Sequence, residues 1–416
     1  MKPKGTAAIS FILLTVFIDV LGIGIIIPII PQLIGQLTGQ PEVMTPESLS
    51  FSSGYGGWLM FSYALMQFIF SPILGGLSDR YGRRPILLIS LLGLGIDYIF
   101  HALAPTITWL FVGRVIAGFC GASFTTASAY IADVSEPEKR AQNFGLIGVA
   151  FGLGFIFGPT LGGIIGKNFG VRAPFYVAAG LSFLNFIYGY FVLPESLPAE
   201  NRRRFELKRS NPVGSLINIK RFPVLYSMLA SFLLIYLAAH AVQSNWTFYT
   251  MYRFGWDMAD VGYSLAVVGI LVAAVQGGLI RIIIPKFGQK TSVFIGFSLY
   301  AIGLVLFGIA GQGWLMYVFL VPYCLGGVAG PALQGIISSQ VPPNEQGELQ
   351  GTLTSIMSVT SIFGPLMMNG LFSLFTSPAA PLVFPGIAFE TGALLTIIST
   401  LLLIKPLSKI KGSPKQ

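Results

Sequence analysis

The chain has 416 residues, of which 54% are hydrophobic and only 10% are charged, whereas soluble domains carry about 25% charged residues. So few charges cannot cover a water-soluble protein of this length, which excludes a soluble fold and makes lipid the solvent for most of the surface. The net charge of +9 does not indicate nucleic-acid binding, because the basic residues lie between apolar segments and form no continuous face.

Twelve apolar segments follow one another along the chain, each close to the roughly 20 residues that cross a bilayer. They occupy residues 7–33, 54–77, 85–104, 107–131, 142–165, 174–193, 223–250, 261–284, 291–310, 314–338, 350–374 and 382–404. The first segment is too long for the apolar region of a signal peptide, so we predict a retained helix. The sequence therefore predicts an all-α membrane protein with twelve transmembrane helices.

The basic residues between the segments predict the orientation of the chain. With a cytoplasmic N-terminus, all but four of the 25 basic residues fall in cytoplasmic segments, as the positive-inside rule requires. The exceptions are Lys167, Arg172 and Arg253 outside, and Arg114 within a span. We therefore expect both termini to be cytoplasmic.

The longest polar stretch separates two sets of six spans. We predict an N-terminal six-helix bundle over residues 1–193, a cytoplasmic linker over 194–222, and a C-terminal six-helix bundle over 223–416.

Pairs of glycines at one spacing link equivalent spans of the two halves. Each pair is 206 residues apart: Gly56 with Gly262, Gly82 with Gly288, and Gly121 with Gly327. The common spacing favours duplication of a six-span unit. Parallel repeats of this kind form transporters whose substrate site lies between the halves, near the middle of the membrane.

The loop after the second span, GGLSDRYGRR from Gly75 to Arg84, is the strongest motif and packs an acid and three arginines into six residues. Asp79 at a helix end can accept charge-assisted hydrogen bonds from an arginine and from backbone N–H groups. Such a cluster can latch neighbouring helices in one conformation. The alternative is a plain anchor that obeys the positive-inside rule.

This loop resembles the signature G-x-L-a-D-r-x-G-r-r of the major facilitator superfamily. The resemblance implies two pseudo-symmetric six-helix bundles and a cytoplasmic gate that holds the outward-facing state, with Asp133 at the end of the fourth span as partner. The implied gate residues are Gly75, Asp79, Arg80, Gly82, Arg83, Arg84 and Asp133.

Glycines of the fifth predicted span recur every four residues and share one helix face. Small residues on one face let two helices approach closely, and Pro159 favours a bend. Tight packing alone is one explanation. The stretch also resembles the motif of drug/proton antiporters, which implies export; the matching positions are Gly145, Gly154, Gly158, Pro159, Gly162 and Gly163.

Asp19, Asp97 and Arg114 lie within predicted spans, where an ionisable group costs roughly 2.5–3.5 kcal/mol or more and points to function. Both acids lie near the middle of the hydrocarbon core. Desolvation there favours the neutral acid, and a nearby arginine favours the carboxylate. An acid that faces each side in turn can therefore bind and release a proton. Structural carboxylates and a fixed counter-ion are the alternatives.

Nearly all of the first half resembles the tetracycline/proton antiporters, through Phe17–Gly24, Ile96–Tyr98 and Arg114. The resemblance implies that Asp19 and Asp97 are proton-coupling acids and that Arg114 is their charge partner. The second half follows at residues 253–256, 331–335 and 346–351.

Two departures weaken the case for a tetracycline–metal substrate. The Gram-negative tetracycline exporters carry a histidine in span eight and an acid in span nine, where this chain has Val272 and Tyr300. His240 and Glu390 are candidate substitutes, with helix packing and an interfacial position as the alternatives. We expect His101 to be structural.

Polar and aromatic residues of the later spans suit an amphipathic ligand, although interhelical hydrogen bonds explain them almost as well. The candidate substrate-binding residues are Gln243, Asn245, Trp246 and Gln334. Cys120 and Cys324 lie in apolar runs and give no disulfide framework.

These features predict a proton-coupled antiporter that exports amphipathic, drug-like or tetracycline-like molecules across the bacterial inner membrane by alternating access. We expect it to act as a monomer, with no metal, cofactor or nucleic acid. A proton-coupled uptake symporter would use the same acids but leaves the antiporter motif unexplained. A receptor has no need of paired mid-span carboxylates, and an enzyme is disfavoured because the sequence has no Walker A loop and no H-E-x-x-H motif.

Overall fold

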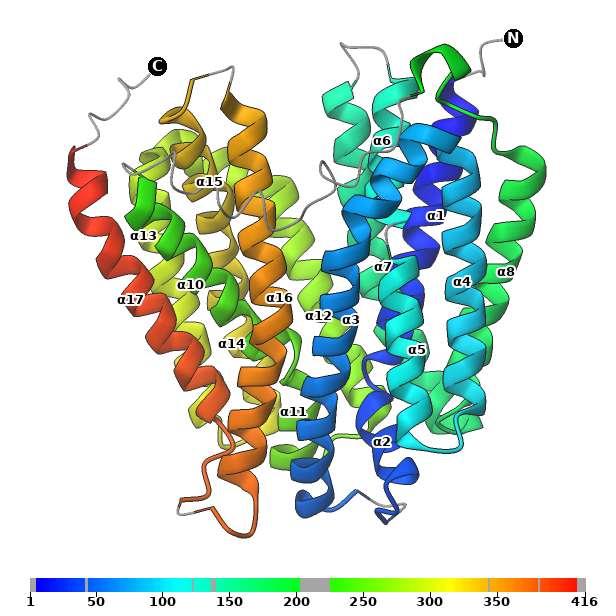
Figure 1. Ribbon diagram of the computed structural model, residues 1–416. Coiled ribbons are helices and arrows are strands. Elements are labelled where there is room, and N and C mark those ends of the chain that lie inside the picture. Colours follow the sequence, from blue (N-terminus) through cyan, green and yellow to red (C-terminus); the bar gives the residue numbers. More distant parts are fainter. Residues whose placement is uncertain are drawn as a thin grey trace. The chain divides into compact units, whose positions relative to one another are not determined.

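The computed structural model describes residues 5–41, 44–121, 123–135, 140–202, 225–342, 345–380 and 382–409, and within these ranges the chain forms helices and no strands (Figure 1). The earlier helices are α1 (Gly5–Ile26), α2 (Ile30–Leu37), α3 (Pro46–Tyr81), α4 (Arg83–Leu103), α5 (Ile107–Cys120), α6 (Ser123–Val134), α7 (Arg140–Phe169), α8 (Ala173–Val192) and η1 (Ala199–Asn201). The later ones are α10 (Tyr226–Gln243), α11 (Trp246–Phe254), α12 (Met258–Ala274), η4 (Val275–Leu279), α13 (Ile280–Ile309), α14 (Gly313–Leu325), η5 (Gly326–Val328), α15 (Ala329–Ser339), α16 (Gln346–Thr376) and α17 (Ile387–Lys409).

The helices confirm the twelve predicted spans. Among the described residues, 10 helical stretches are long and apolar enough to cross a membrane, and one of them, Met258–Ile309, runs for 52 residues. That stretch is two spans, because Gly288 interrupts it with φ 77° and ψ 157°. The shorter apolar helix α5 is continued by α6 and makes up the remaining span.

The predicted glycine pairs have matching places in the two halves. Gly82, before α4, has φ 105° and ψ 160°, close to the values of Gly288, and this region of backbone space is essentially restricted to glycine. Gly121 ends α5, and Gly327 lies in the short turn η5 between α14 and α15. The helices of the two halves are thus interrupted at equivalent positions, which supports duplication of a six-span unit.

The backbone of Gly288 gives a clean test of this turn. A side-chain carbon added there meets no atom within 4 Å, so Gly288→Ala should destabilise the protein by about 1–3 kcal/mol through backbone strain alone. Gly330→Ala in α15 is the control, because its added carbon also meets nothing and alanine favours a helix. Thermal unfolding in detergent should show a lower midpoint for Gly288→Ala only; equal midpoints would contradict the strain argument.

The contacts divide the chain into two units, each of which is compact in itself. The first contains Met1–Met44, Ser62–Asn211 and Asp257–Gly269, and the second contains Thr45–Phe61, Pro212–Trp256 and Ile270–Gln416. The start of α3 thus packs with the second unit and the start of α12 with the first. The predicted boundaries of the two bundles stay a prediction, and residues 203–222 of the predicted linker lie outside the described residues.

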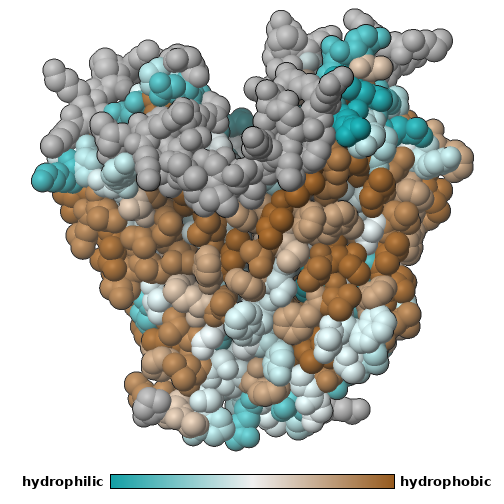
Figure 2. All heavy atoms as spheres, in the orientation of Figure 1, coloured by the Kyte–Doolittle hydropathy of each residue, from teal (hydrophilic) through white to brown (hydrophobic). Residues whose placement is uncertain are grey.

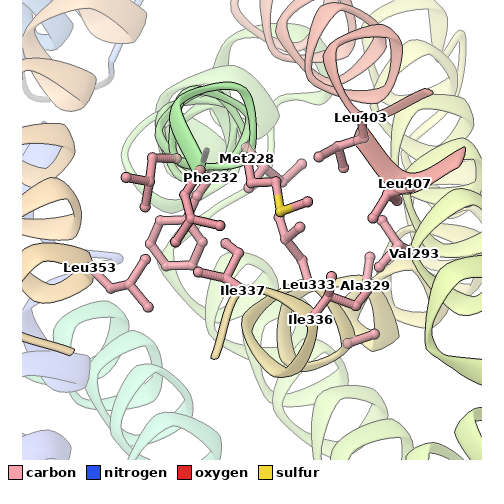
Figure 3. Packing of buried hydrophobic residues seen from close by; sticks show 14 of the residues in the cluster. Met228, Phe232, Val293, Ala329, Leu333, Ile336, Ile337, Leu353, Leu403 and Leu407 are labelled. Atoms are coloured by element: carbon pink, nitrogen blue, oxygen red, sulfur yellow. The ribbon is translucent and has the colours of Figure 1, made fainter. Parts of the chain in front are cut away.

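Each unit has an apolar core between its helices. In the first, Phe11, Val16 and Val20 of α1 pack with Ala127 and Ile131 of α6. In the second, side chains of α10, α13, α15, α16 and α17 meet, and Figure 3 shows Met228, Phe232, Leu333, Leu353 and Leu403 converging there.

Large apolar side chains also face outward. Phe169, Leu184 and Phe191 expose 77%, 65% and 79% of their surface, and apolar residues cover the middle of the face drawn in Figure 2, with polar residues toward its ends. Contiguous apolar surface of this extent is not compatible with water. The described helices are therefore those of an integral, multi-pass membrane protein.

Candidate functional site

A buried acid–arginine pair joins α4 to α5. Asp97 of α4 is fully buried, and Arg114 of α5 donates from Nη2 to its Oδ2 at 3.0 Å. A charge at this depth persists only with a partner, and α4 and α5 pack along their length. The structure thus brings together two of the three residues that the sequence singles out for proton coupling.

His101 completes this cluster, although the sequence interpretation set it aside as structural. It lies one turn after Asp97 on α4, is 1% exposed, and accepts a hydrogen bond at Nε2 from Arg114 Nε at 3.0 Å. Its Nδ1 lies 2.9 Å from the backbone oxygen of Asp97 and 3.0 Å from Oδ1. The i, i+4 spacing of Asp97 and His101 was the signal that could have found it.

Asp19 and two tyrosines surround the pair. Asp19 of α1 is 9% exposed, and the hydroxyls of Tyr63 and Tyr98 lie within electrostatic reach of Asp19, Asp97 and Arg114. The guanidinium of Arg114 lies 5.8 Å from the centre of the Tyr63 ring. The two acids thus share one polar region inside the first unit.

Gly113 makes room for this cluster. A side-chain carbon added there would lie 2.8 Å from both Asp97 Oδ1 and His101 Nδ1, and closer still to His101 Cε1. Since no real side chain tolerates such contacts, a glycine at this point of α5 is what allows the acid and the histidine to lie against the neighbouring helix.

The loop after α3 forms a second polar cluster. Arg83 donates to Asp79 at 2.5 Å, to Ser78 Oγ at 2.6 Å and to Asp133 of α6 at 3.1 Å. Ser196, after α8, donates to the same oxygen of Asp133 at 3.0 Å. Asp79, Arg83 and Asp133 line an open cavity of 410 Å³. The residues of the predicted gate therefore lie together, and Arg83 is their common partner.

The other predicted gate residues lie around this cluster. Arg80 is exposed and lies over the ring of Tyr81 at 5.0 Å, and Arg84 donates to the backbone oxygen of Tyr190 at 2.6 Å. A carbon added at Gly75 meets nothing within 4 Å. Gly82 supplies the positive-φ turn described above.

Glu195 is a residue that the sequence interpretation missed. Its carboxylate accepts from the backbone N–H groups of Arg83 at 2.8 Å and Arg84 at 3.3 Å, which are first-turn donors of α4 without a helical partner. It also leaves no space for a side chain at Gly82. Nothing near Glu195 in the sequence signals this, because the cap comes from 111 positions further along the chain.

Removal of this cap should be measurable. Loss of a capping side chain costs about 0.5–2 kcal/mol, so Glu195→Ala should lower the thermal unfolding midpoint in detergent and release Arg83 and Arg84. Glu200→Ala is the matched control, because Glu200 is an exposed glutamate of the same segment. Equal midpoints for the two variants would exclude Glu195 as the cap of α4.

The predicted glycine face of α7 packs against the backbone of α1. A carbon added at Gly158 would lie 2.7 Å from the Leu21 oxygen and 2.9 Å from Gly24 Cα, and one at Gly162 would overlap the Ile25 oxygen. Gly154 packs in the same way on Val20. The side chains of residues 141–145, which include Gly145, are outside the described part of α7.

The far end of the same helix contacts the start of α12. Gly163 leaves no room between α7 and the Met258 backbone, and Lys167 pairs with Asp257 at 2.6 Å. Asp257 also accepts from the N–H groups of Ala259 and Asp260, which caps α12. Burial alone would raise the pKa of Asp257, but the hydrogen bonds from Lys167 and the backbone outweigh it and lower that pKa. This stabilisation is present above the usual carboxyl pKa and is lost as the pH falls through the lowered value.

The candidate substrate-binding residues lie in different surroundings in the second unit. Gln243 is exposed at the end of α10, and Trp246 is 2% exposed between the rings of Phe307 and Phe389. Asn245 is fully buried, and neither side-chain amide atom has a hydrogen-bond partner among the described residues. Gln334 of α15 donates to Gln350 at 3.1 Å.

The departures in spans eight and nine also lie in the second unit. Tyr300 stacks on Tyr323 with ring centres 4.7 Å apart and hydroxyls 3.3 Å apart, and Val272 lies in α12. His240 is buried against Gly364 of α16. Glu390 of α17 packs on Gly308, and its buried Oε1 accepts no hydrogen bond from the part of the chain that the structure describes.

Comparison with known proteins supports the membrane-protein class that this architecture defines. The family model described as Major Facilitator Superfamily matches residues 12–365. Tetracycline resistance protein, class C, of Escherichia coli is 38% identical over 95% of this chain and 96% of its own length. The class H protein of Pasteurella multocida is 34% identical over 98% of both chains. The chain belongs to the major facilitator superfamily, in the branch that contains these proteins.

Solved structures agree on the fold. The human organic anion transporter MFSD10 is 23% identical and covers 96% of this chain and all of its own, with a TM-score of 0.70. A bacterial homologue of the human lysosomal transporter Spinster is 13% identical and covers 100% of both chains, with a TM-score of 0.73. The predicted fold of two pseudo-symmetric six-helix bundles is therefore confirmed.

Proposed function

We propose that this protein is a proton-coupled antiporter that exports amphipathic, drug-like or tetracycline-like molecules by alternating access. The observation that carries the proposal is the buried pair of Asp97 and Arg114 inside the first unit. Burial of a carboxylate favours its neutral, protonated state, whereas an arginine partner favours its charged, paired state. Such a group can take a proton from one side of a membrane and release it to the other.

Asp19 is the second protonatable group of this proposal. It shares the polar region with Asp97 and Arg114, because Tyr63 and Tyr98 are within electrostatic reach of all three. A change of charge on one acid is therefore sensed by the other. Arg114 acts as the fixed charge that holds the acids ionised until protons arrive.

The loop cluster acts as the cytoplasmic gate, and the glycine face of α7 carries the antiporter motif. The ion pairs of Arg83 with Asp79 and Asp133 connect the loop after α3 with α6, and release of these pairs would accompany opening. The relatives named above are resistance proteins, which supports export. We place the chain in the bacterial inner membrane, with both termini cytoplasmic, acting as a monomer.

The substrate is an amphipathic organic molecule held mainly by the second half of the chain. Gln243, Asn245, Trp246 and Gln334 are the proposed contacts, and the buried amide of Asn245 has hydrogen-bonding capacity to spare. The tyrosine pair of Tyr300 and Tyr323 presents an aromatic surface and no carboxylate. We therefore expect planar, partly apolar ligands, and no strict need for a bound divalent cation.

Proton release from acid-loaded proteoliposomes tests this function. Tetracycline and a panel of other amphipathic drugs are added outside, with and without Mg²⁺, while a pH-sensitive dye reports the interior. We expect the interior to become more alkaline with at least one drug and not with empty liposomes. No response across the panel, together with accumulation of a metabolite, would show an uptake symporter instead.

A further inference from the structure

The imidazole of His101 is held between two partners and cannot turn freely. Arg114 Nε donates to its Nε2 at 3.0 Å, and its Nδ1 lies against Asp97. The ring stacks on Phe175 of α8 at 5.6 Å. Gly113 closes the other side, since a side-chain carbon there would overlap the ring.

The hydrogen bond from Arg114 determines the tautomer of this histidine. A guanidinium has no acceptor, so Nε2 must carry the lone pair, and a neutral imidazole then carries its hydrogen on Nδ1. A second proton on Nε2 would break the bond from Arg114 and place two cations in contact. An added proton is therefore expected at Asp97 and not at His101.

The same bond limits how Arg114 can hold Asp97. A guanidinium usually gives a carboxylate two parallel hydrogen bonds, one to each oxygen. Here Nη2 binds Oδ2 of Asp97, whereas Nε is directed to His101. Among the described residues, Oδ1 of Asp97 is buried with no hydrogen-bond partner, although Nδ1 of His101 faces it at 3.0 Å. The oxygen that a two-fold pair would cover is therefore the one that Arg114 leaves free.

We propose that His101 is a positioning residue that keeps the Arg114–Asp97 pair to a single hydrogen bond, so that the guanidinium leaves Oδ1 of Asp97 free to take the proton. The proton forms an O–H bond at Oδ1, and the charge of Asp97 is lost while Arg114 stays tied to α4 through His101. This role rests on the proposed function, because it concerns the group that function uses.

Other titratable groups among the described residues lie within electrostatic reach of Asp97. They are Asp19 of α1, Tyr63 of α3, Tyr98 of α4 and Cys120 of α5. Within the described residues, α8 contributes the uncharged ring of Phe175 to this cluster. A substitution at position 101 leaves these groups in place but can remove Nδ1 from beside Oδ1. Loss of that donor would favour the neutral acid, so only a shift of the Asp97 midpoint to more acidic pH reports on Arg114.

Two amide side chains of different length at position 101 can show whether His101 positions Arg114 or only fills space. Gln at position 101 can place an acceptor oxygen near the site of Nε2 and keep Arg114 Nε engaged. Asn has the same amide but is one methylene shorter, so its amide reaches only the place that Nδ1 of the imidazole occupies. Nε of Arg114 is then free to bind Oδ1 of Asp97. His101→Leu removes both nitrogens and should behave like His101→Asn.

The readout is the pH titration of the Asp97 carboxylic-acid C=O band by infrared spectroscopy in detergent, assigned by its loss in Asp97→Asn. For His101→Asn and His101→Leu we expect a midpoint about one pH unit more acidic, because a second charged hydrogen bond favours the carboxylate. His101→Gln should keep the parental midpoint. The pH profile of drug-driven proton release should shift in the same order.

An unchanged or more alkaline midpoint in His101→Asn, or an equal shift in His101→Gln, would overturn the proposal. If His101→Leu does not fold, as judged by size-exclusion chromatography, the comparison of Asn with Gln still decides. The infrared titration needs no transport. A shifted band without any proton exchange would therefore contradict the proposed function and leave the role of His101 standing.

Discussion

Asp97→Asn should reduce drug-driven proton release to the level of empty liposomes. An amide is close in shape to the carboxylate but cannot take up or release a proton. Asp97 is fully buried, so no solvent-exposed group can take over its role at that position. The measurement is the proteoliposome assay described above, with the amount of folded protein matched by size-exclusion chromatography.

The same variant leaves Arg114 as a partly buried cation without its carboxylate. Removal of one partner of a buried pair costs about 3–5 kcal/mol, so the unfolding midpoint should also fall. The double variant Asp97→Asn/Arg114→Gln removes both charges and should recover much of that stability without recovering exchange. This control separates a coupling role from a structural one. Retained exchange in Asp97→Asn, or restored exchange in the double variant, would refute proton coupling at Asp97.

Gly158→Leu should abolish or strongly reduce exchange while the protein still folds. The added carbon would lie 2.7 Å from the Leu21 oxygen and 2.9 Å from Gly24 Cα, and these backbone atoms of α1 can move only if the whole helix moves. Overpacking of this kind costs about 1–3 kcal/mol. The larger consequence is a displaced α1, which carries Asp19.

Gly152→Leu is the matched control on the same helix. A carbon added at Gly152 meets no atom within 4 Å, so the same leucine should be tolerated there. Exchange and unfolding midpoints are compared for both variants in the same detergent and lipid. Equal exchange in the two variants would show that close contact between α7 and α1 is not required.

Much of the architecture was predictable because lipid simplifies the sequence pattern. Every span must pair its own backbone N–H and C=O groups in hydrogen bonds and present apolar side chains to lipid. Long apolar runs therefore identified the twelve spans. The spacing of 206 residues identified Gly82 and Gly288, and the structure gives both the same positive-φ backbone. The breaks inside spans, such as the turn between α5 and α6, were not predicted, since apolar composition is the same on both sides of a break.

The candidate site was predictable where charge stands out against an apolar background. Asp97 and Arg114 were found in this way, because each is unusual inside a span. His101 and Glu195 were not, for different physical reasons. The i, i+4 spacing from Asp97 indicated one partner for His101, but a single histidine in an apolar helix usually only packs. Only the position of Arg114 in space gives it a second partner. Glu195 acts across 111 positions, which no local pattern can reveal.

Two helices are shared between the units. Helix α3 passes from the second unit to the first at Ser62, and α12 passes from the first to the second at Ile270. Helix α12 is followed at once by the π-helical segment Val275–Leu279, and carbons added at Gly277 and Gly278 meet nothing. Segments of π-helix are rare and occur frequently at functional sites, which singles out Val275–Leu279 within the second unit.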